Sequence, residues 1–232
     1  MMAPAEPAPT NEWRIFGPPG TGKTTYLTKQ VKGAVEKYGN EAVLVTSFTR
    51  AAAAELAGRD LPIARQNIGT LHSHCFRAIG NPKLAETKIK EWNAEHANMT
   101  LSASASIDEG VADQTYAGEA DEMYAEMCRN RARMLDRRCW KPSVLRFANS
   151  WDAWKKDSEV VDFTDLLEIA LRDVHIAPGN PSVLIADEAQ DFSALQMALV
   201  RQWSNGTEYS LIAGDDDQCQ PNGTMRSEEQ HV

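Results

Sequence analysis

The chain has 232 residues and a formal net charge of −9, and its composition is typical of a soluble globular protein with a substantial core. This charge argues against a cationic surface that coats nucleic acid, although a local basic groove is compatible with it. Four widely spaced cysteines without a C-x-x-C pair favour a reducing compartment. Residues 1–10 lack the apolar core of a signal peptide or membrane span, so we expect a disordered lead-in and a cytoplasmic protein.

The first predicted elements are a buried strand at 13–16 and a helix at 25–38, separated by a glycine-rich loop. Residues 17–24, Gly-Pro-Pro-Gly-Thr-Gly-Lys-Thr, fill the pattern G-x-x-x-x-G-K-[ST]. In such a loop the backbone N–H groups surround a polyphosphate, the lysine reaches the β- and γ-phosphates, and the last hydroxyl ligates Mg²⁺. The pattern therefore predicts a nucleotide site made by Gly17, Pro18, Pro19, Gly20, Thr21, Gly22, Lys23, Thr24 and Thr25.

The apolar run 42–46 predicts a strand buried on both faces, as in a parallel sheet covered by helices. An alanine-rich helix follows and ends at Gly58. Phe48 and Arg50 lie where the strand gives way to this helix, at the edge where open α/β sheets bind ligands. Residues 67–74 are interpreted as another short strand that reaches the same edge with the polar side chains Thr70, His72 and Ser73.

Residues 81–159 alternate charged helical stretches with an acidic run at 108–126 and a basic run at 129–141. This pattern predicts a helical subdomain inserted into the α/β domain. The basic run has two interpretations: it follows a phosphate backbone, or it is a solvated helix face that pairs with the acidic run. After the insertion, Asp162 is a good N-cap of a helix, and a structural role is favoured for it.

A buried strand at 182–186 ends in two adjacent acids, Asp187 and Glu188. Beside a phosphate loop, the first carboxylate holds Mg²⁺ and the second orients and deprotonates the attacking water. A last strand at 209–213 is followed by Gln218, whose amide could sense the γ-phosphate. We therefore predict an α/β P-loop NTPase domain from 11–80 and 160–218, with the catalytic residues Lys23, Asp187, Glu188 and Gln218 and the metal ligands Thr24 and Asp187.

Six segments, in this order, resemble the superfamily 1 DNA helicases of the UvrD/Rep/PcrA type: 14–25, 46–56, 68–77, 162–167, 183–191 and 211–218. This resemblance implies a RecA-like domain that uses ATP and Mg²⁺, acts on single-stranded or partly duplex DNA with 3′ to 5′ polarity, and serves DNA repair or replication. It also implies that Gln190 and Gln218 couple the nucleotide state to DNA. The residues that it implies as DNA contacts are Phe48, Thr49, Arg50, Thr70 and His72.

The sequence also departs from that family. The glutamine-bearing stretch that recognises adenine is absent before Trp13, Ala51 replaces a lysine, and Thr25 replaces a basic residue. Without the resemblance, Phe48 would be interpreted as a core residue. These differences leave open a second function: a P-loop module that binds nucleotide without helicase activity.

The largest departure lies in the tail 219–232. The family continues there into a second RecA-like half. We expect that half as a covalent or separate partner, so this chain alone should hydrolyse ATP slowly. Residues 219–225, Cys-Gln-Pro-Asn-Gly-Thr-Met, resemble the opening block of inteins, in which the cysteine attacks the preceding carbonyl. An intein-interrupted helicase and a truncated or frameshifted gene are therefore both compatible with this ending.

Overall fold

The computed structural model of the chain describes residues 11–18, 21–58, 61–102 and 118–215. Its contacts divide them into two compact units. The first, here the sheet unit, contains the described residues up to His74, those of Val174–Phe192 and those from Met197 onward. The second, here the helical unit, contains the described residues of Cys75–Asp173 and Ser193–Gln196.

Strands and helices alternate except between β3 and β4, where five α-helices follow one another in the described residues. The strands are β1 (Glu12–Phe16), β2 (Val43–Ser47), β3 (Ile68–Thr70), β4 (Val183–Asp187) and β5 (Tyr209–Gly214). The α-helices are α1 (Lys23–Tyr38), α2 (Arg50–Ala57), α3 (Leu71–Ala78), α4 (Ile89–Glu95), α5 (Glu119–Ala132), α6 (Pro142–Asp157), α7 (Phe163–Asp173) and α8 (Ala194–Ser204). Within the described ranges, none of these helices is long and apolar enough to cross a membrane.

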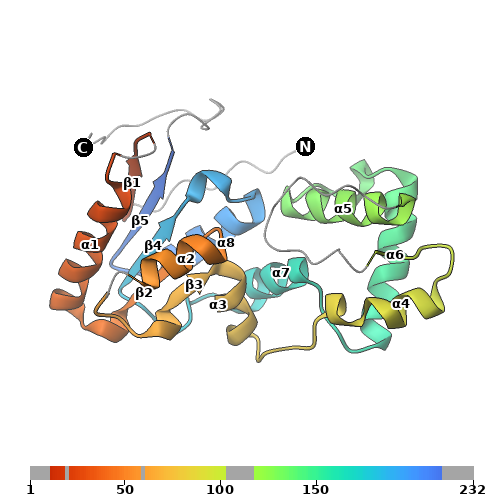
Figure 1. Cartoon of the computed structure of the whole chain (residues 1–232), viewed down its shortest axis with the longest axis horizontal. Helices are drawn as coiled ribbons and strands as arrows, with labels where there is room; N and C mark the ends of the chain where they lie inside the picture. The colour runs from red at the N-terminus through yellow and green to blue at the C-terminus, as the bar shows by residue number, and fades with distance from the viewer. Residues whose placement is uncertain (1–10, 19–20, 59–60, 103–117, 216–232) are drawn as a thin grey trace. The chain divides into compact units, whose positions relative to one another are not determined.

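The five strands form one parallel sheet in the order β1-β5-β4-β2-β3. β1 and β5, at opposite ends of the described sequence, lie side by side in it (Figure 1). The predicted α/β fold of a P-loop NTPase is confirmed. Because all strands run in one direction, their carboxyl ends share one edge of the sheet, and the loops that carry the predicted motifs start there.

One face of the sheet packs on α1. Leu27, Val31 and Ala34 repeat along α1 at helical spacing and are buried. They share one hydrophobic cluster with every second residue of the inner strands, namely Val43, Val45, Val183, Ile185, Leu211 and Ala213. Since strand residues alternate between the two faces, the odd-numbered positions of β2 and β4 face α1.

The prediction of a strand over 67–74 was wrong in its second half. β3 ends at Thr70 and α3 begins at Leu71. The Thr70 hydroxyl accepts a hydrogen bond from Ser73 N at 3.2 Å, and Ser73 Oγ donates to Thr70 O at 2.7 Å. These contacts cap the helix, so His72 lies in its first turn rather than on a strand.

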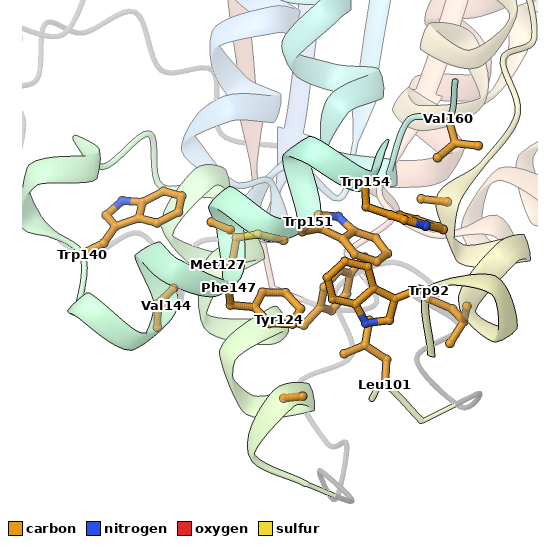
Figure 2. Close-up of a cluster of buried hydrophobic side chains, with 14 residues drawn as sticks. Trp92, Leu101, Tyr124, Met127, Trp140, Val144, Phe147, Trp151, Trp154 and Val160 are labelled. Atoms are coloured by element: carbon orange, nitrogen blue, oxygen red, sulfur yellow. The ribbon is translucent and has the colours of Figure 1, made fainter. Parts of the chain in front are cut away.

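Aromatic rings form the core of the helical unit (Figure 2). The Trp92 ring meets the rings of Trp151 and Trp154 edge to face, with centroids 5.0 and 5.5 Å away. Tyr124 of α5 packs against Trp151 at 5.3 Å. Such aromatic pairs stabilise the fold by more than the burial of their surface area alone. Short helices can therefore form a core of their own.

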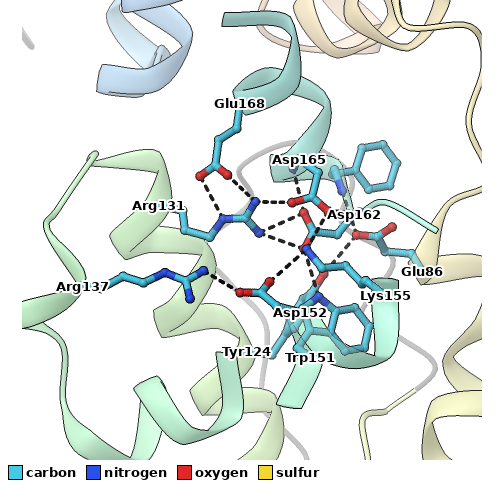
Figure 3. A network of polar contacts seen from close by, with 11 residues as sticks. Glu86, Tyr124, Arg131, Arg137, Trp151, Asp152, Lys155, Asp162, Asp165 and Glu168 are labelled. Atoms are coloured by element: carbon cyan, nitrogen blue, oxygen red, sulfur yellow. Dashed lines mark hydrogen bonds and ion pairs between the residues drawn. The ribbon is translucent and has the colours of Figure 1, made fainter. Parts of the chain in front are cut away.

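A buried ionic network fixes α7 in the helical unit (Figure 3). Both carboxylate oxygens of Asp162 accept hydrogen bonds from Arg131 Nη1, at 3.0 and 2.9 Å, and Lys155 Nζ donates to one of them at 2.7 Å. Asp162 and Asp165 each accept a bond from the other's backbone N–H at 2.8 Å, so the predicted cap at Asp162 is confirmed. The compact unit therefore extends beyond the predicted insertion of 81–159.

Other members of the basic run also pair within the helical unit. Arg137 Nη2 lies 2.6 Å from Asp152 Oδ2, and Lys141 Nζ lies 3.0 Å from Glu126 Oε2. Glu126 belongs to the acidic run, so pairing between the two runs is observed at this point. Contact of the basic run with DNA stays a prediction.

Candidate nucleotide-binding site

The phosphate loop follows β1 and leads directly into α1. Gly22 has φ +88°, a left-handed conformation that favours glycine, and it is the residue that precedes the helix. At position 17 an added Cβ would meet Thr21 Oγ1 at 2.9 Å. At position 22 the backbone angle favours glycine, and at position 17 a larger side chain would displace that of Thr21. Pro19 and Gly20 lie outside the described residues.

Lys23 folds back over this loop. Its ammonium donates hydrogen bonds to the carbonyl oxygens of Gly17 and Pro18, the latter at 3.3 Å. These carbonyls hold the positive charge beside the loop at the N-terminus of α1, where the backbone N–H groups of a helix also favour anions. Thr24, the next residue, is half-buried, and Thr25 is exposed. The charge and the donors at this end of α1 suit a polyphosphate.

Asp187 ends β4 at the same edge of the sheet. Its odd-numbered position puts it on the α1 face, and only 4% of it is exposed. Burial, reinforced by the neighbouring Glu188 carboxylate, raises the pKa of Asp187 to about 6, while the charge of Lys23 acts in the opposite direction. A nearby cation stabilises the charged form of a partly desolvated carboxylate, so Asp187 is a suitable magnesium ligand.

The residues that follow Asp187 turn sharply. Glu188 has φ +54° and ψ +38°, a left-handed conformation that is strained for a residue with a side chain. Its Oε2 accepts a hydrogen bond from Gln190 Nε2 at 2.5 Å, and Gln190 Oε1 accepts one from Asp215 N at 3.0 Å. Gln190 thereby joins the end of β4 to the end of β5. Gln218, predicted to act nearby, lies outside the described residues.

The donors at this edge fit a magnesium ion. Mg²⁺ in nucleotide sites takes one or two protein oxygens and completes its shell with phosphates and water. Thr24 would supply a hydroxyl and Asp187 a carboxylate, and their role as ligands stays a prediction. Beside Asp187, in register on β2, Ser47 has a buried hydroxyl with no hydrogen-bond partner among the described residues. This edge of the sheet therefore contains a buried hydroxyl to which no described protein group hydrogen-bonds.

The predicted DNA contacts on β2 and α2 lie at the adjoining part of the edge. Phe48 is half-buried, and its ring packs against Phe192, with centroids 6.3 Å apart. Thr49 Oγ1 accepts a hydrogen bond from Ala52 N at 3.1 Å and caps α2. Arg50 begins α2 and is exposed. Phe48 is therefore neither fully buried nor fully exposed.

The predicted DNA contacts Thr70 and His72 lie at the carboxyl end of β3, at the same edge of the sheet. Ser47 is in register with both Asp187 and Thr70, so the ends of β4, β2 and β3 adjoin. Thr70 is buried and uses its hydroxyl to cap α3. Burial, aided by the charge of Arg50, lowers the pKa of His72 to about 4. His72 is thus a neutral hydrogen-bonding group at physiological pH.

Sequence reasoning missed two residues at this edge, Ser47 and Phe192. Ser47 is a small polar residue at the end of an apolar strand, and a serine at such a position only weakly indicates a functional role. Phe192 follows the two acids by four positions, and no local pattern distinguishes it from a core residue. Only the strand register and the ring packing identify them.

Comparison with known proteins gives the family. The sequence profile of the AAA domain family matches residues 4–224, most of the chain. No curated protein matches the chain. The matched region contains the phosphate loop, the two acids after β4 and all five strands of the sheet. The chain belongs to the AAA domain family of P-loop nucleotide-binding proteins.

Proposed function

We propose that this chain is the ATP-binding domain of a DNA helicase of the UvrD/Rep/PcrA type, which binds Mg-ATP and single-stranded DNA. The observation that carries the proposal is the strand register at the carboxyl edge of the sheet. It brings Asp187 of the nucleotide site next to Ser47, and through Ser47 next to Phe48 and Thr70. Nucleotide and DNA would thus bind to adjacent strand ends of one rigid sheet.

Each group at the nucleotide site has a role in this proposal. Lys23 leaves the carbonyls of Gly17 and Pro18 to bind the β- and γ-phosphates, and Thr24 and Asp187 hold magnesium. The ion, when bound, offsets the negative charge of the phosphates. Glu188 orients the attacking water and accepts its proton, while Gln190 holds the Glu188 carboxylate in place.

The DNA contacts follow from the side chains at the same edge. Phe48 offers a half-buried ring on which a base can stack regardless of sequence. Arg50 supplies a positive charge for a phosphate, and neutral His72 supplies a hydrogen-bonding ring nitrogen. A helicase needs contacts of this sequence-independent kind.

A second candidate is a P-loop module that binds nucleotide without acting on DNA. It is favoured by the ion pairs of Arg131, Arg137 and Lys141, which direct part of the basic run toward acids of the helical unit. The two candidates share the nucleotide site, but the module neither hydrolyses the nucleotide nor binds DNA.

Titrations with a fluorescent ATP analogue and with a fluorescein-labelled oligothymidylate separate these candidates. The Lys23→Ala variant should lose roughly 10- to 100-fold in nucleotide affinity, the range expected for a hydrogen bond to a charged group. Lys32→Ala, on the exposed side of the same helix, is the matched control. If the wild type binds ATP but not DNA, only the module remains; if it binds no nucleotide, both candidates fail.

A further inference from the structure

Ser47 is the last residue of β2 and lies between the two neighbouring strands. It is in register with Asp187 on β4 and with Thr70 on β3. Residues in register on parallel neighbours point to the same side of a sheet. Ser47 and Asp187 therefore share a face at the carboxyl edge.

That face is the one covered by α1. Val43 and Val45 precede Ser47 at two-residue spacing and pack in the cluster that contains Leu27 of α1. The same alternation along β4 brings Asp187 to this face, and the helix that covers it starts at Lys23. The Ser47 side chain therefore belongs to the side of the sheet that carries the phosphate loop.

The Ser47 hydroxyl is buried and unused. Ser47 is 1% exposed, and its Oγ has no hydrogen-bond partner among the described residues. A buried hydroxyl without a partner is unfavourable, so its presence calls for a group that binds it. Thr46, one residue earlier, has the same property but points to the opposite face. Among the described residues, Ser47 alone combines this property with a position beside Asp187.

We propose that Ser47 is a positioning residue of the magnesium-nucleotide site, whose hydroxyl hydrogen-bonds an ordered water at the Asp187 carboxylate. This inference rests on the proposed nucleotide site, but it does not require DNA binding. The water satisfies the buried hydroxyl and fixes the orientation of the carboxylate. An ordered water of this kind is nearly as favourable as a direct hydrogen bond.

The alternative role of Ser47 is spatial: a small side chain that leaves room for Asp187. Ser47→Ala distinguishes the two roles, because it keeps the size and removes the hydroxyl. Thr46→Val is the matched control, since it removes an equally buried hydroxyl from the other face. Both variants and the wild type are titrated with a fluorescent ATP analogue in the presence of Mg²⁺ and in EDTA, and their thermal unfolding is recorded with and without Mg-nucleotide.

With Mg²⁺, Ser47→Ala should bind nucleotide about three- to tenfold more weakly than the wild type, the loss expected for one hydrogen bond. In EDTA the two should bind alike, and Thr46→Val should match the wild type in both conditions. Without nucleotide the Ser47→Ala melting temperature should stay close to that of the wild type, whereas its rise on adding Mg-nucleotide should shrink.

Equal Mg-nucleotide affinity of wild type and Ser47→Ala would overturn the inference and leave the proposed function intact. Equal losses in Ser47→Ala and Thr46→Val would overturn it as well. If Ser47→Ala fails to fold, Ser47→Cys replaces it, because a thiol is a weak hydrogen-bond donor on a side chain of similar shape. Absence of nucleotide binding by the folded wild type would overturn the proposed function and this inference together.

Discussion

The rings of Phe48 and Phe192 pack against each other with their planes inclined by 40°. Phe48 follows β2, and Phe192 ends the short turn that contains Gln190. The pair therefore joins the residue proposed to stack on a DNA base to the turn that carries the proposed hydrolytic acid. Neither residue is fully buried, so part of each is exposed to solvent.

Phe192→Leu should weaken binding of single-stranded DNA by about three- to tenfold, because it removes the ring that orients Phe48. Phe48→Leu should lose at least as much, and the double variant should lose little more than Phe48→Leu alone. Fluorescence anisotropy with labelled oligothymidylate measures all three. Trp13→Leu, which removes a half-exposed ring from β1, is the control and should bind as the wild type. Additive losses in the double variant would contradict coupling between the two rings.

Arg131→Ala should destabilise the protein by up to about 3–5 kcal/mol, because it removes one of the two cations that pair with the buried Asp162 carboxylate and leaves Lys155 as the other. Arg131 is 6% exposed, and Asp162 is fully buried. Burial opposes the charge of Asp162, but Arg131 and Lys155 hold the pKa of its carboxyl below the ordinary value. Urea unfolding monitored by tryptophan fluorescence measures the change.

The control for this change is Arg138→Ala. Arg138 pairs with Asp136 at the surface, with 89% of its side chain exposed. An exposed pair contributes little, so the unfolding free energy should stay close to that of the wild type. Similar losses in the two arginine variants would show that the buried network has no special part in stability.

The sheet could be predicted from the sequence more completely than the site. β2 and β4 are buried on both faces, so each appears as a continuous apolar run, and both predictions are confirmed. The start of α3 was missed because Thr70 caps it with a side chain that also suits a strand. The bonds of Arg131 join residues more than 30 positions apart, and the left-handed angles of Glu188 depend on the surrounding fold. No local pattern encodes such features.

Glu86 should make the stability of the helical unit depend on pH. Its Oε1 accepts hydrogen bonds from Tyr124 Oη and from Phe163 N, both at 3.0 Å. Burial, reinforced by the charge of Asp162, raises the pKa of Glu86 to about 7. A raised carboxyl pKa means that the folded state prefers the protonated form. The protonated Glu86 carboxyl makes its full contribution to stability below the pKa that Glu86 has in the unfolded chain. This contribution is lost as the pH rises through 7.

Glu86→Gln imitates the protonated side chain and should remove this dependence. The unfolding free energy of the variant minus that of the wild type should therefore rise between pH 4 and pH 8. The rise should reach up to about 3 kcal/mol, because each unit of pKa shift corresponds to about 1.4 kcal/mol. Urea unfolding of both proteins across this range provides the comparison, in which groups common to both cancel. A difference that stays constant with pH would contradict a raised pKa.

Glu188→Asn should separate stability from hydrolysis. Glu188 is held in a left-handed conformation, which asparagine tolerates better than glutamate does. Relief of this strain should contribute about 0.5–1 kcal/mol to the unfolding free energy, and the loss of the hydrogen bond from Gln190 Nε2 opposes it. The shorter amide cannot accept the proton of the attacking water, so ATP hydrolysis should fall by about 10²- to 10⁴-fold while nucleotide binding is retained.

The matched control is Glu159→Asn. Glu159 has nearly the same backbone angle, φ +53°, but it is an exposed residue of the helical unit between α6 and α7. This variant should gain stability from the relief of strain alone and hydrolyse ATP at the wild-type rate. Thermal unfolding and phosphate release, measured on both variants, test the two effects separately. A Glu188→Asn protein that hydrolyses ATP like the wild type would exclude Glu188 as the general base, whereas stability lost in both variants would show that neither backbone angle is strained.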